Sequence, residues 1–567
     1  MLIASFVNPA EADSQAARHP HRLSRPLPGL LVWDDNDRWT AVPAPLLGLQ
    51  GSIVDRRAGR ALSPATVAER IASQGEATLA DWSPAFRIAW TSDNAAHVAA
   101  DHCGLGHWYL WSGDGVAAIS DHATTIARHF GLGVDTHALG GLALIGSMVG
   151  QDSAIAGVSK LEAGQIATLA AGRLTRRAMA AAGRFAETPD AIAATMTRLF
   201  AAHPDAEIEL SGGWDSRLML VGLPRTTRHG MPGFTIGTPD DSDVIIAKRL
   251  AADGAMPHDI VDLSGLEALS DDGFTARIID AAARDDYGGN PLDRLGINLI
   301  NDSRPPRPRF SGQNGEILRG FYYPGQPLDA PASPALAARV INWRIISNDL
   351  VTPAMFDAGW LAATRAAVTS RLEAQLLAPG GQWGDALDNF YLTQRMQRWC
   401  GAAASATLGR RPVLLPYFDA DVLALAAATP ASAKAESRFV AQEILRLDPG
   451  LARIPLASRL VPSQVARGGL AGRVALARQF VGKAGAKTMQ QLARRDVATS
   501  RSIAASTLAS HHGLPGKIDV HRLDQLKIFA PQALEGFQRG ETGMTRATMG
   551  FVLNVDFLLK RLAEPGP

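Results

Sequence analysis

The chain has 567 residues, of which 46% are hydrophobic and 20% are charged, and its formal net charge is +1. One hydrophobic core seldom organises a chain of this length, so we expect two or more domains. The balanced charge excludes a general electrostatic attraction to nucleic acid or to membrane surfaces. Two cysteines, Cys103 and Cys400, exclude a disulfide framework and indicate a reducing compartment.

The N-terminal residues lack the basic segment and the long apolar run of a signal peptide. The longest apolar stretch, around residues 140–149, is interrupted by glycine and is too short to span a bilayer. We therefore expect a cytoplasmic protein that has neither a membrane nor a nucleic acid as its partner.

The first 180 residues contain short runs of alternating apolar residues separated by turn residues. These runs predict strands that include residues 86–90, 97–100, 108–111 and 116–120. Helices are expected at about 121–131, with Asp121 as the N-cap, and near 136–148. The pattern predicts a strand-rich, layered domain. Cys103 and Cys400 are both expected to be small buried residues.

From Thr188-Pro189, a typical helix start, strands and helices alternate along the chain. Strands are predicted at 206–210, 233–237, 258–262 and 307–310, with helices between them, which indicates a parallel sheet and an α/β fold. The last third of the chain is predicted to be mostly helical. Residues 463–501 hold eight Lys or Arg against one acid, which favours a solvated helix face; contact with ATP or an acidic peptide is the alternative.

The most informative motif is Ser-Gly-Gly-Trp-Asp-Ser at residues 211–216, which follows the strand ending at Leu210. Gly212 and Gly213 allow a tight turn and the close approach of a ligand to the backbone. The free N–H groups at the start of the next helix favour a pyrophosphate group. The Ser211 and Ser216 hydroxyls can donate to the same oxygens, and Asp215 can hold Mg²⁺.

This motif resembles the nucleotide loop of the asparagine synthetase family. Looser matches follow in the family's order: Phe234–Gly237 with the acidic residues after it, Ser311–Tyr322, Arg411–Asp419, and, in the N-terminal part, Asp101–Gly104 and Val158–Gly164. The resemblance implies a glutaminase-like (Ntn-type) α+β sandwich domain over residues 1–182. It also implies an ATP-pyrophosphatase-type synthetase domain, with a parallel sheet and a helical C-terminal part, over residues 188–567.

The resemblance also implies roles for individual residues. Glu316 matches the family's second Mg²⁺-binding acid, and Ile236 and Gly312 are expected to line the ATP site with the Leu210–Ser216 loop. The family uses a late lysine to stabilise the transition state, and the candidates for this role here are Lys434, Arg459 and Arg467. The implied cofactors are ATP and Mg²⁺.

One departure from the family pattern changes the expected reaction. Glutamine-hydrolysing members use a cysteine that follows Met1, whereas this chain has Leu2. Without a thiolate the N-terminal domain cannot form a glutamyl thioester, so the amine comes from another source. Two relatives share this loss, the β-lactam synthetases and the cyclases of lasso peptides.

Gln313 stands where β-lactam synthetases have a tyrosine, and this favours a lasso peptide cyclase. Such an enzyme adenylates an Asp or Glu side chain of a precursor peptide, made of a leader and a core. The freed N-terminal amine then closes a macrolactam, with release of AMP and pyrophosphate. The expected partners are the precursor peptide and a leader peptidase or leader-binding protein. A β-lactam synthetase, an ammonia-dependent ligase of a small amino acid and an inactive peptide-binding scaffold remain alternatives.

Overall fold

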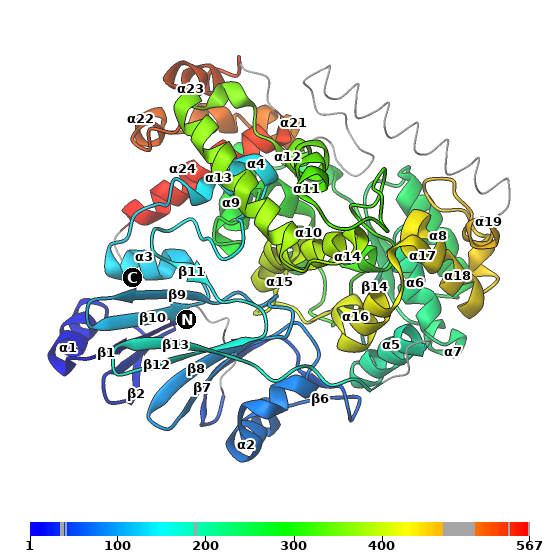
Figure 1. Cartoon of the computed structure of the whole chain (residues 1–567), viewed down its shortest axis with the longest axis horizontal. Coiled ribbons are helices and arrows are strands. Elements are labelled where there is room, and N and C mark those ends of the chain that lie inside the picture. The colour runs from blue at the N-terminus through cyan, green and yellow to red at the C-terminus, as the bar shows by residue number, and fades with distance from the viewer. Residues whose placement is uncertain (35–38, 40–41, 186–189, 469–504, 542–544, 565–567) are drawn as a thin grey trace.

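The computed structural model describes residues 1–34, 39, 42–185, 190–468, 505–541 and 545–564. Antiparallel sheets form the N-terminal region and a parallel sheet forms the middle of the chain, so the protein is a mixed α/β protein, as predicted. Figure 1 shows the antiparallel sheets at the lower left, the parallel sheet on the right and most C-terminal helices above. None of the described helices has both the length and the apolar character needed to cross a membrane.

Two antiparallel sheets make up the N-terminal region. The six-stranded sheet has the order β11 (Ser159–Lys160), β9 (Tyr109–Gly113), β10 (Val116–Ser120), β1 (Leu2–Phe6), β3 (Leu30–Trp33) and β2 (Leu23–Leu27). The five-stranded sheet has the order β13 (Arg173–Ala178), β12 (Gln165–Ala170), β8 (Ala95–Ala100), β7 (Arg87–Ser92) and β4 (Leu46–Gln50).

The alternation of side chains along each strand builds four layers from these sheets. On β1, Ile3 faces an apolar cluster shared by both sheets, whereas Leu2 and Ala4 join a cluster on the opposite face. Helices α1 (Pro9–Arg18) and α3 (Ala123–Phe130) contribute to that outer cluster. Helix α2 (Pro64–Gln74) covers the outer face of the five-stranded sheet. The predicted layered region is therefore a helix–sheet–sheet–helix sandwich.

The predicted strands of this region are confirmed within a few residues, but Asp121 is not the cap of the following helix. The N-cap of α3 is His122, which makes no side-chain cap. Asp121 instead accepts a hydrogen bond from the Met1 amino group at 2.8 Å. The carboxylate of Asp286, far along the chain, accepts from the Ala123 and Thr124 N–H groups at 2.6 and 3.2 Å. A cap supplied by tertiary contact leaves no local signal in the sequence.

The predicted parallel sheet is confirmed. Its order is β16 (His258–Val261), β15 (Gly233–Ile236), β14 (Glu207–Glu209), β17 (Arg309–Phe310) and β18 (Val413–Leu414), and all neighbours are parallel. The helices that connect or cover these strands are α5 (Ala191–Ala202), α6 (Trp214–Gly222), α7 (Arg225–Arg228), α8 (Ser242–Asp253), α9 (Asp271–Arg284) and α10 (Leu295–Ser303). The predicted helix start at Thr188-Pro189 lies outside the described residues, and α5 is described from Ala191 onward.

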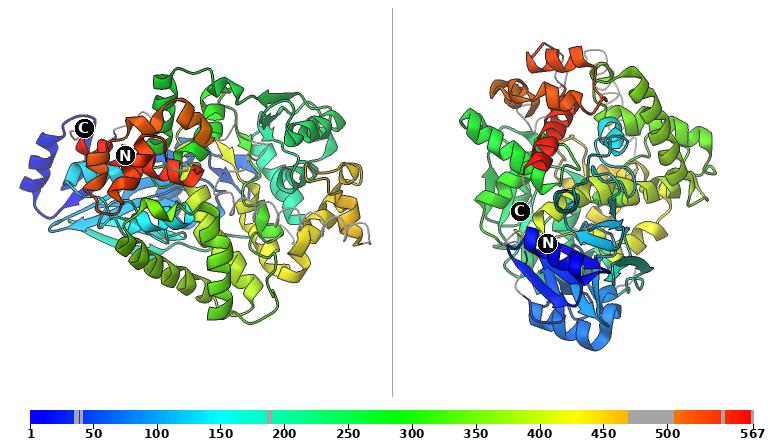
Figure 2. Two further views of the ribbon diagram at one scale, coloured as in Figure 1. Left: turned by 90° about the horizontal axis from the view of Figure 1, so that it is seen from above. Right: turned by 90° about the vertical axis from the view of Figure 1, so that its left-hand side faces the viewer.

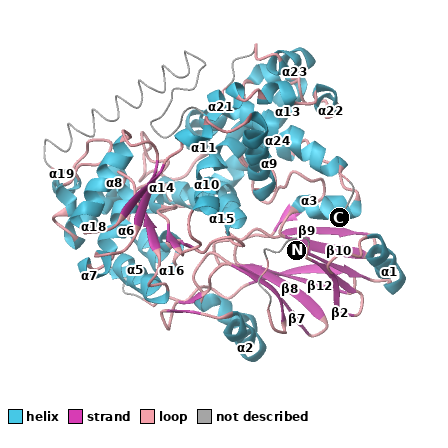
Figure 3. Ribbon diagram, turned by 180° about the vertical axis from the view of Figure 1, so that it is seen from behind, coloured by secondary structure: helices cyan, strands magenta, loops and turns pink. Residues whose placement is uncertain are grey.

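The rest of the chain is mostly helical, as predicted (Figure 3). Its helices are α11 (Pro334–Val340), α12 (Ile346–Asp349), α13 (Ala358–Leu377), α14 (Trp383–Phe390), α15 (Gly401–Thr407), α16 (Ala420–Ala428), α17 (Ala431–Lys434), α18 (Arg438–Leu447) and α19 (Pro462–Arg467). Helices α21 (Ala505–His511), α22 (Val520–Asp524), α23 (Pro531–Gln538) and α24 (Arg546–Ala563) follow. Two segments, η6 (Ile341–Ile345) and η8 (Tyr391–Cys400), are π-helical. Most of the basic segment at 463–501 lies outside the described residues.

The ends of the chain contribute to one packed core, and α24 lies against α3, α4 (Ala138–Ile145) and α9 (Figure 2). Buried ion pairs also join the N-terminal and parallel-sheet regions. The Arg56 Nε atom donates to the Asp419 carboxylate at 2.9 Å, and both side chains are at most 1% exposed. The two regions therefore form a continuous molecule, although they are built from different kinds of sheet.

Candidate functional site

The Leu210–Ser216 loop lies at the carboxyl edge of the parallel sheet. It connects β14, the middle strand, to α6. From β14 the chain builds β15 and β16 on one side and then crosses to place β17 on the other side. In open parallel sheets such a reversal leaves a crevice at the carboxyl ends of the strands, where ligands bind. The loops after β14 and β17 meet at this point.

The predicted turn is held together by its own polar groups. The Ser216 hydroxyl accepts from the Ser211 N–H at 3.0 Å and donates to the Ser211 carbonyl at 3.1 Å. The Gly213 N–H donates to the Ser211 hydroxyl at 3.2 Å. The Gly212 N–H donates to the Asp243 carboxylate at 2.9 Å. A phosphate group bound here would have to replace some of these bonds.

Glycines allow three segments to approach one another closely at this loop. A Cβ atom on Gly212 would lie 2.6 Å from the Cβ atom of Ala457, and one on Gly315 would lie 2.4 Å from the carboxyl carbon of Asp215. A Cβ atom on Gly312 would lie 3.3 Å from the Ser216 nitrogen. The residues predicted from the two loops are therefore brought together, and the first two glycines leave no room for a side chain.

Two carboxylates and one guanidinium form the centre of the site. Arg319 donates to both oxygens of Asp215, each at 2.9 Å, and to Glu316 at 3.0 Å. The side chains of Asp215, Glu316 and Arg319 are 19%, 26% and 24% exposed, so a ligand can reach them. The Tyr391 hydroxyl donates to the other oxygen of Glu316, Oε2, at 2.9 Å.

The environment raises the pKa of all three groups, but for different reasons. Burial raises the pKa of Glu316, and the nearby Asp215 charge raises it further, whereas Arg319 lowers it. Burial lowers the pKa of Arg319, but Asp215 and Glu316 more than offset this effect and raise it above its usual range. Burial raises the pKa of Tyr391 well above its usual value, so this side chain is a neutral hydrogen-bond donor to Glu316.

The donor set fits Mg²⁺ bound together with a nucleotide. Mg²⁺ takes one or two carboxylates plus phosphate oxygens and water, and Asp215 and Glu316 supply two carboxylates. Within the described residues no group of three or more His, Cys, Asp or Glu side chains could hold a metal by itself. One nitrogen of Arg319 contacts both carboxylates, so Mg²⁺ between them would require this guanidinium to move.

The three basic residues that were predicted as candidates to stabilise the transition state lie in different surroundings. Lys434 is buried, and its polar contacts are with the Asp388 carboxylate and the Ala426 carbonyl, not with the loop. Arg459 is exposed and lies two residues from Ala457, whose N–H donates to the Gly212 carbonyl at 2.9 Å. Arg467 is exposed at the end of α19. Of the three candidates, the structure brings the Arg459 segment to the loop.

Sequence reasoning missed the basic residue that lies between the carboxylates. Arg319 is part of the Ser311–Tyr322 segment, but nothing in its spacing indicates an ion pair with Asp215. Tyr417, whose hydroxyl donates to the Asp215 carbonyl at 2.6 Å, was missed as well, although it lies in the Arg411–Asp419 match. The segment matches could have directed attention to both residues, because all these segments end at the same edge of the sheet.

The two remaining predicted ATP-site residues, Leu210 and Ile236, lie at the ends of strands. Leu210 is buried, and its N–H donates to the Phe234 carbonyl of β15 at 2.8 Å. Ile236 is the last residue of β15, one strand away from the loop, and it is partly buried. Both residues are therefore at the edge that the loop occupies.

The N-terminal region offers no thiol at the position of the family's nucleophile. Leu2 is fully buried in β1. Both cysteines are buried as predicted, and burial raises the pKa of Cys103 well above its usual value and that of Cys400 to about 12. Neither cysteine is poised to act as a thiolate.

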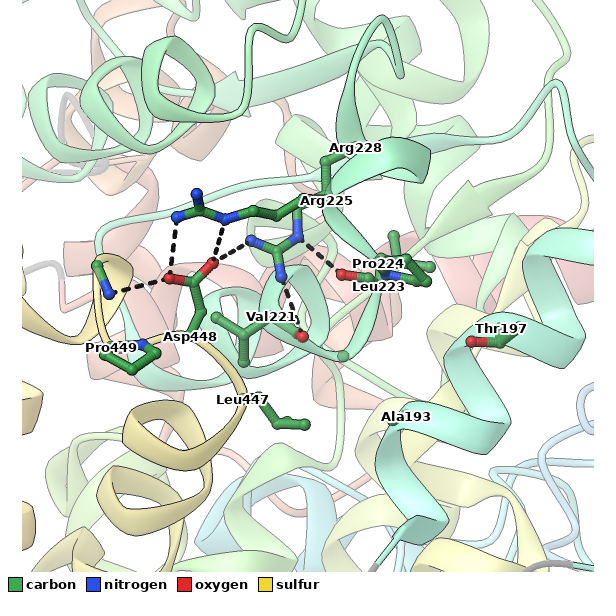
Figure 4. A pocket seen from close by; sticks show the side chains of 12 residues that line it. Ala193, Thr197, Val221, Leu223, Pro224, Arg225, Arg228, Leu447, Asp448 and Pro449 are labelled. Carbon is green, nitrogen blue, oxygen red and sulfur yellow. Dashed lines mark hydrogen bonds and ion pairs between the residues drawn. The ribbon is translucent and has the colours of Figure 1, made fainter.

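A separate pocket of about 530 Å³ lies at the other end of α6 (Figure 4). Apolar side chains such as Val221 and Leu447 line it. Its polar groups are bonded to one another, since Asp448 accepts from Arg228 at 2.7 Å and from Arg225 at 3.3 Å. None of residues 211–216 lines this pocket, and its charged groups already have partners.

Comparison of the sequence with models of known protein families finds no match, and comparison with curated proteins finds none either.

Proposed function

We propose that this protein is an ATP-dependent, amide-forming ligase that activates a carboxylate as an acyl-adenylate. The observation that carries the proposal is that the Ser-Gly-Gly-Trp-Asp-Ser turn, which contains Asp215, meets Glu316. They meet at the carboxyl edge of the parallel sheet, where the strand order reverses. The turn lies at the start of α6, where backbone N–H groups favour phosphate oxygens. Asp215 and Glu316 would hold Mg²⁺, which neutralises phosphate charge when it is bound.

In this mechanism the residues of the chain mainly position and stabilise the reacting groups. The substrate carboxylate attacks the α-phosphorus of ATP, and pyrophosphate leaves toward the Ser211–Ser216 turn. Displaced from the two carboxylates, Arg319 would donate to phosphate oxygens and stabilise the charge that develops there. An amine then attacks the acyl carbon, AMP leaves, and an amide forms. Arg459, two residues from the Gly212 contact, is a second candidate for phosphate contact.

The finer proposal is a lasso peptide cyclase. Support comes from the motif resemblance, from Gln313 in place of a tyrosine, and from the buried Leu2 that removes glutamine as an ammonia source. The acyl group would be an Asp or Glu side chain of a precursor peptide, and the amine would be the freed N-terminus of its core. The N-terminal sandwich would then be a degenerate, glutaminase-like domain. A leader peptidase or leader-binding protein would be the partner, in the cytoplasm.

Mass spectrometry of a genetically neighbouring precursor peptide tests the proposal. The peptide, carrying ¹⁸O in its side-chain carboxylates, is incubated with this protein, the neighbouring protease and Mg-ATP. We expect a core lighter by one water, pyrophosphate, and AMP that carries one ¹⁸O atom from the carboxylate. Asp215→Asn should abolish all three products, whereas the exposed-site control Asp13→Asn should not.

Other products would contradict parts of the proposal. Formation of ADP and phosphate would contradict adenylation. A linear core, with AMP formed only when free amino acids are added, would replace the cyclase by a small-molecule synthetase of the β-lactam or ammonia-dependent type.

A further inference from the structure

Two π-helical segments bring two arginines to one aromatic ring beside the proposed site. Arg344 lies on η6 and Arg395 lies on η8. Their guanidinium carbons are 5.4 and 4.5 Å from the centre of the Phe321 ring. π-Helical turns are rare, and they are concentrated at functional sites. Because two such segments place arginines at one ring, this arrangement indicates a functional role as well as a packing role.

This arginine pair, Arg344 and Arg395, is linked through aromatic rings to the carboxylates of the site. Phe321 follows Arg319 by two residues, and its ring stacks on the Tyr391 ring with the centroids 5.4 Å apart. The Tyr391 hydroxyl donates to Glu316 at 2.9 Å. The two stacked rings of Phe321 and Tyr391 thus connect the arginine pair to Glu316.

Neither arginine of the pair has a carboxylate partner among the described residues. Arg344 donates to the Phe321 carbonyl at 2.9 Å, while its buried Nε atom has no hydrogen-bond partner. Arg395 lies between the rings of Phe321 and Trp399, 5.1 Å from the centre of the latter. Burial lowers the pKa of Arg344, and the charge of Arg395 acts in the same direction. Within the part of the chain that the structure describes, the pair is a concentration of positive charge without a carboxylate partner.

A guanidinium stacked on aromatic rings keeps the N–H donors at its edge available for a planar anion. Carboxylates match this edge with two parallel hydrogen bonds. Phosphate groups are expected at the start of α6, where the Ser211–Ser216 turn lies. The arrangement thus favours a carboxylate ligand at the arginine pair.

We propose that Arg344 and Arg395 form the recognition site for the acidic side chain of the acyl substrate, and that they select it over the corresponding amide. This inference rests on the proposed function, because it assigns the carboxylate subsite of the same reaction. The two arginines are positioning residues: they hold the carboxylate beside the carboxylates of the site before it is activated.

Binding of small acid probes to the full-length protein tests the inference by calorimetry. The probes are the N-acetyl, N-methylamide derivatives of aspartate and glutamate, and the matched controls are the same derivatives of asparagine and glutamine. We expect the acids to bind and the amides not to bind. Arg395→Lys and Arg344→Lys keep the charge but lose the planar fork, so each should weaken acid binding by about tenfold.

A nearby variant controls for nonspecific effects. Arg365→Lys changes an exposed arginine that bonds to Asn342 of η6, and it should leave acid binding unchanged. Arg395→Gln is the second variant if Arg344→Lys does not fold, and it should weaken acid binding at least as much as Arg395→Lys.

Three results would overturn the assignment. They are equal binding of acids and amides, no acid binding by the unmodified protein, and weakened Mg-ATP binding in Arg395→Lys with unchanged acid binding, which would indicate a phosphate site. Failure of the proposed function gives a different result: the unmodified protein would bind acids, with loss in Arg395→Lys, but would not bind Mg-ATP.

Discussion

The N-terminal sandwich and the parallel-sheet region both place an aspartate at a turn, but they use it differently. Asp101 is fully buried and accepts hydrogen bonds from the N–H groups of Phe86, Cys103, Leu105 and Gly106. Asp215 is partly exposed, and its carboxylate is paired with the partly exposed guanidinium of Arg319. A carboxylate saturated by backbone donors holds a fold together, whereas a partly exposed one that is paired with a side chain can be reached by a ligand. The difference predicts which substitutions will cost stability and which will cost function.

The largest loss of stability is expected where the two regions meet. Arg56→Ala leaves the Asp419 carboxylate buried without this partner, which should lower the free energy of unfolding by about 3–5 kcal/mol. Chemical denaturation measures this change. The control is Arg25→Ala in the exposed pair with Asp13, where the loss should be below about 1 kcal/mol. Equal losses in both variants would mean that the contact between the regions contributes little.

The comparison of the two aspartates can be tested with matched substitutions. Asp101→Asn turns one carboxylate oxygen into an N–H donor that faces backbone donors, so stability should fall by about 1–3 kcal/mol. Asp215→Asn removes half of an ion pair at a partly exposed position and should change the free energy of unfolding by less than about 1 kcal/mol. Denaturant titration of both variants is sufficient. A larger loss in Asp215→Asn would reverse the roles assigned to the two residues.

The buried Lys160 of the N-terminal sandwich predicts a pH-dependent change in the free energy of unfolding that is smaller than the change expected for Arg56→Ala. Burial, followed by the charge of Arg398, lowers the pKa of Lys160 from 10.5 to about 7. The unfolded chain keeps the ordinary value, so it binds more protons than the folded chain between pH 7 and pH 10.5, and stability rises with pH in that window. Below pH 7 the lysine is charged in both states, and the folded state bears the full cost.

Lys160→Met should therefore raise the free energy of unfolding by ~2 kcal/mol at pH 6, and this gain should shrink as the pH approaches 10. The exposed Lys248→Met is the control and should show no such trend. A gain for Lys160→Met that does not vary between pH 6 and pH 10 would contradict the assignment.

Much of the fold could be predicted because strands leave a local pattern. Alternating apolar residues located β7, β8 and β10, and the order of strands and helices indicated the parallel sheet. The same alternation misleads in the middle of the sheet. Glu207 follows the pattern of a solvent-facing residue, yet it is buried and paired with Arg304 and Arg411. Helices cover both faces of a parallel sheet, so burial no longer follows alternation.

The candidate site, like the fold, could be predicted from the sequence only in part. The turn at Ser211–Ser216 and its glycines could be predicted because their conformation depends on neighbouring residues. Arg319 and Tyr391 could not, since the contact of Arg319 with Asp215 and that of Tyr391 with Glu316 join residues 104 and 75 positions apart. Asp286, which caps α3 from more than 160 positions away, is a similar case. Partners that only tertiary folding brings together leave no spacing signal.

The most direct test of the account is calorimetric titration of the full-length protein and of Asp215→Asn with Mg-ATP. We expect the unmodified protein to bind Mg-ATP with one site per chain. The variant should bind at least about tenfold more weakly while it unfolds at the same denaturant concentration. Absence of Mg-ATP binding by the unmodified protein, or equal binding by both proteins, would contradict the assignment of the carboxyl edge of the parallel sheet as a nucleotide site.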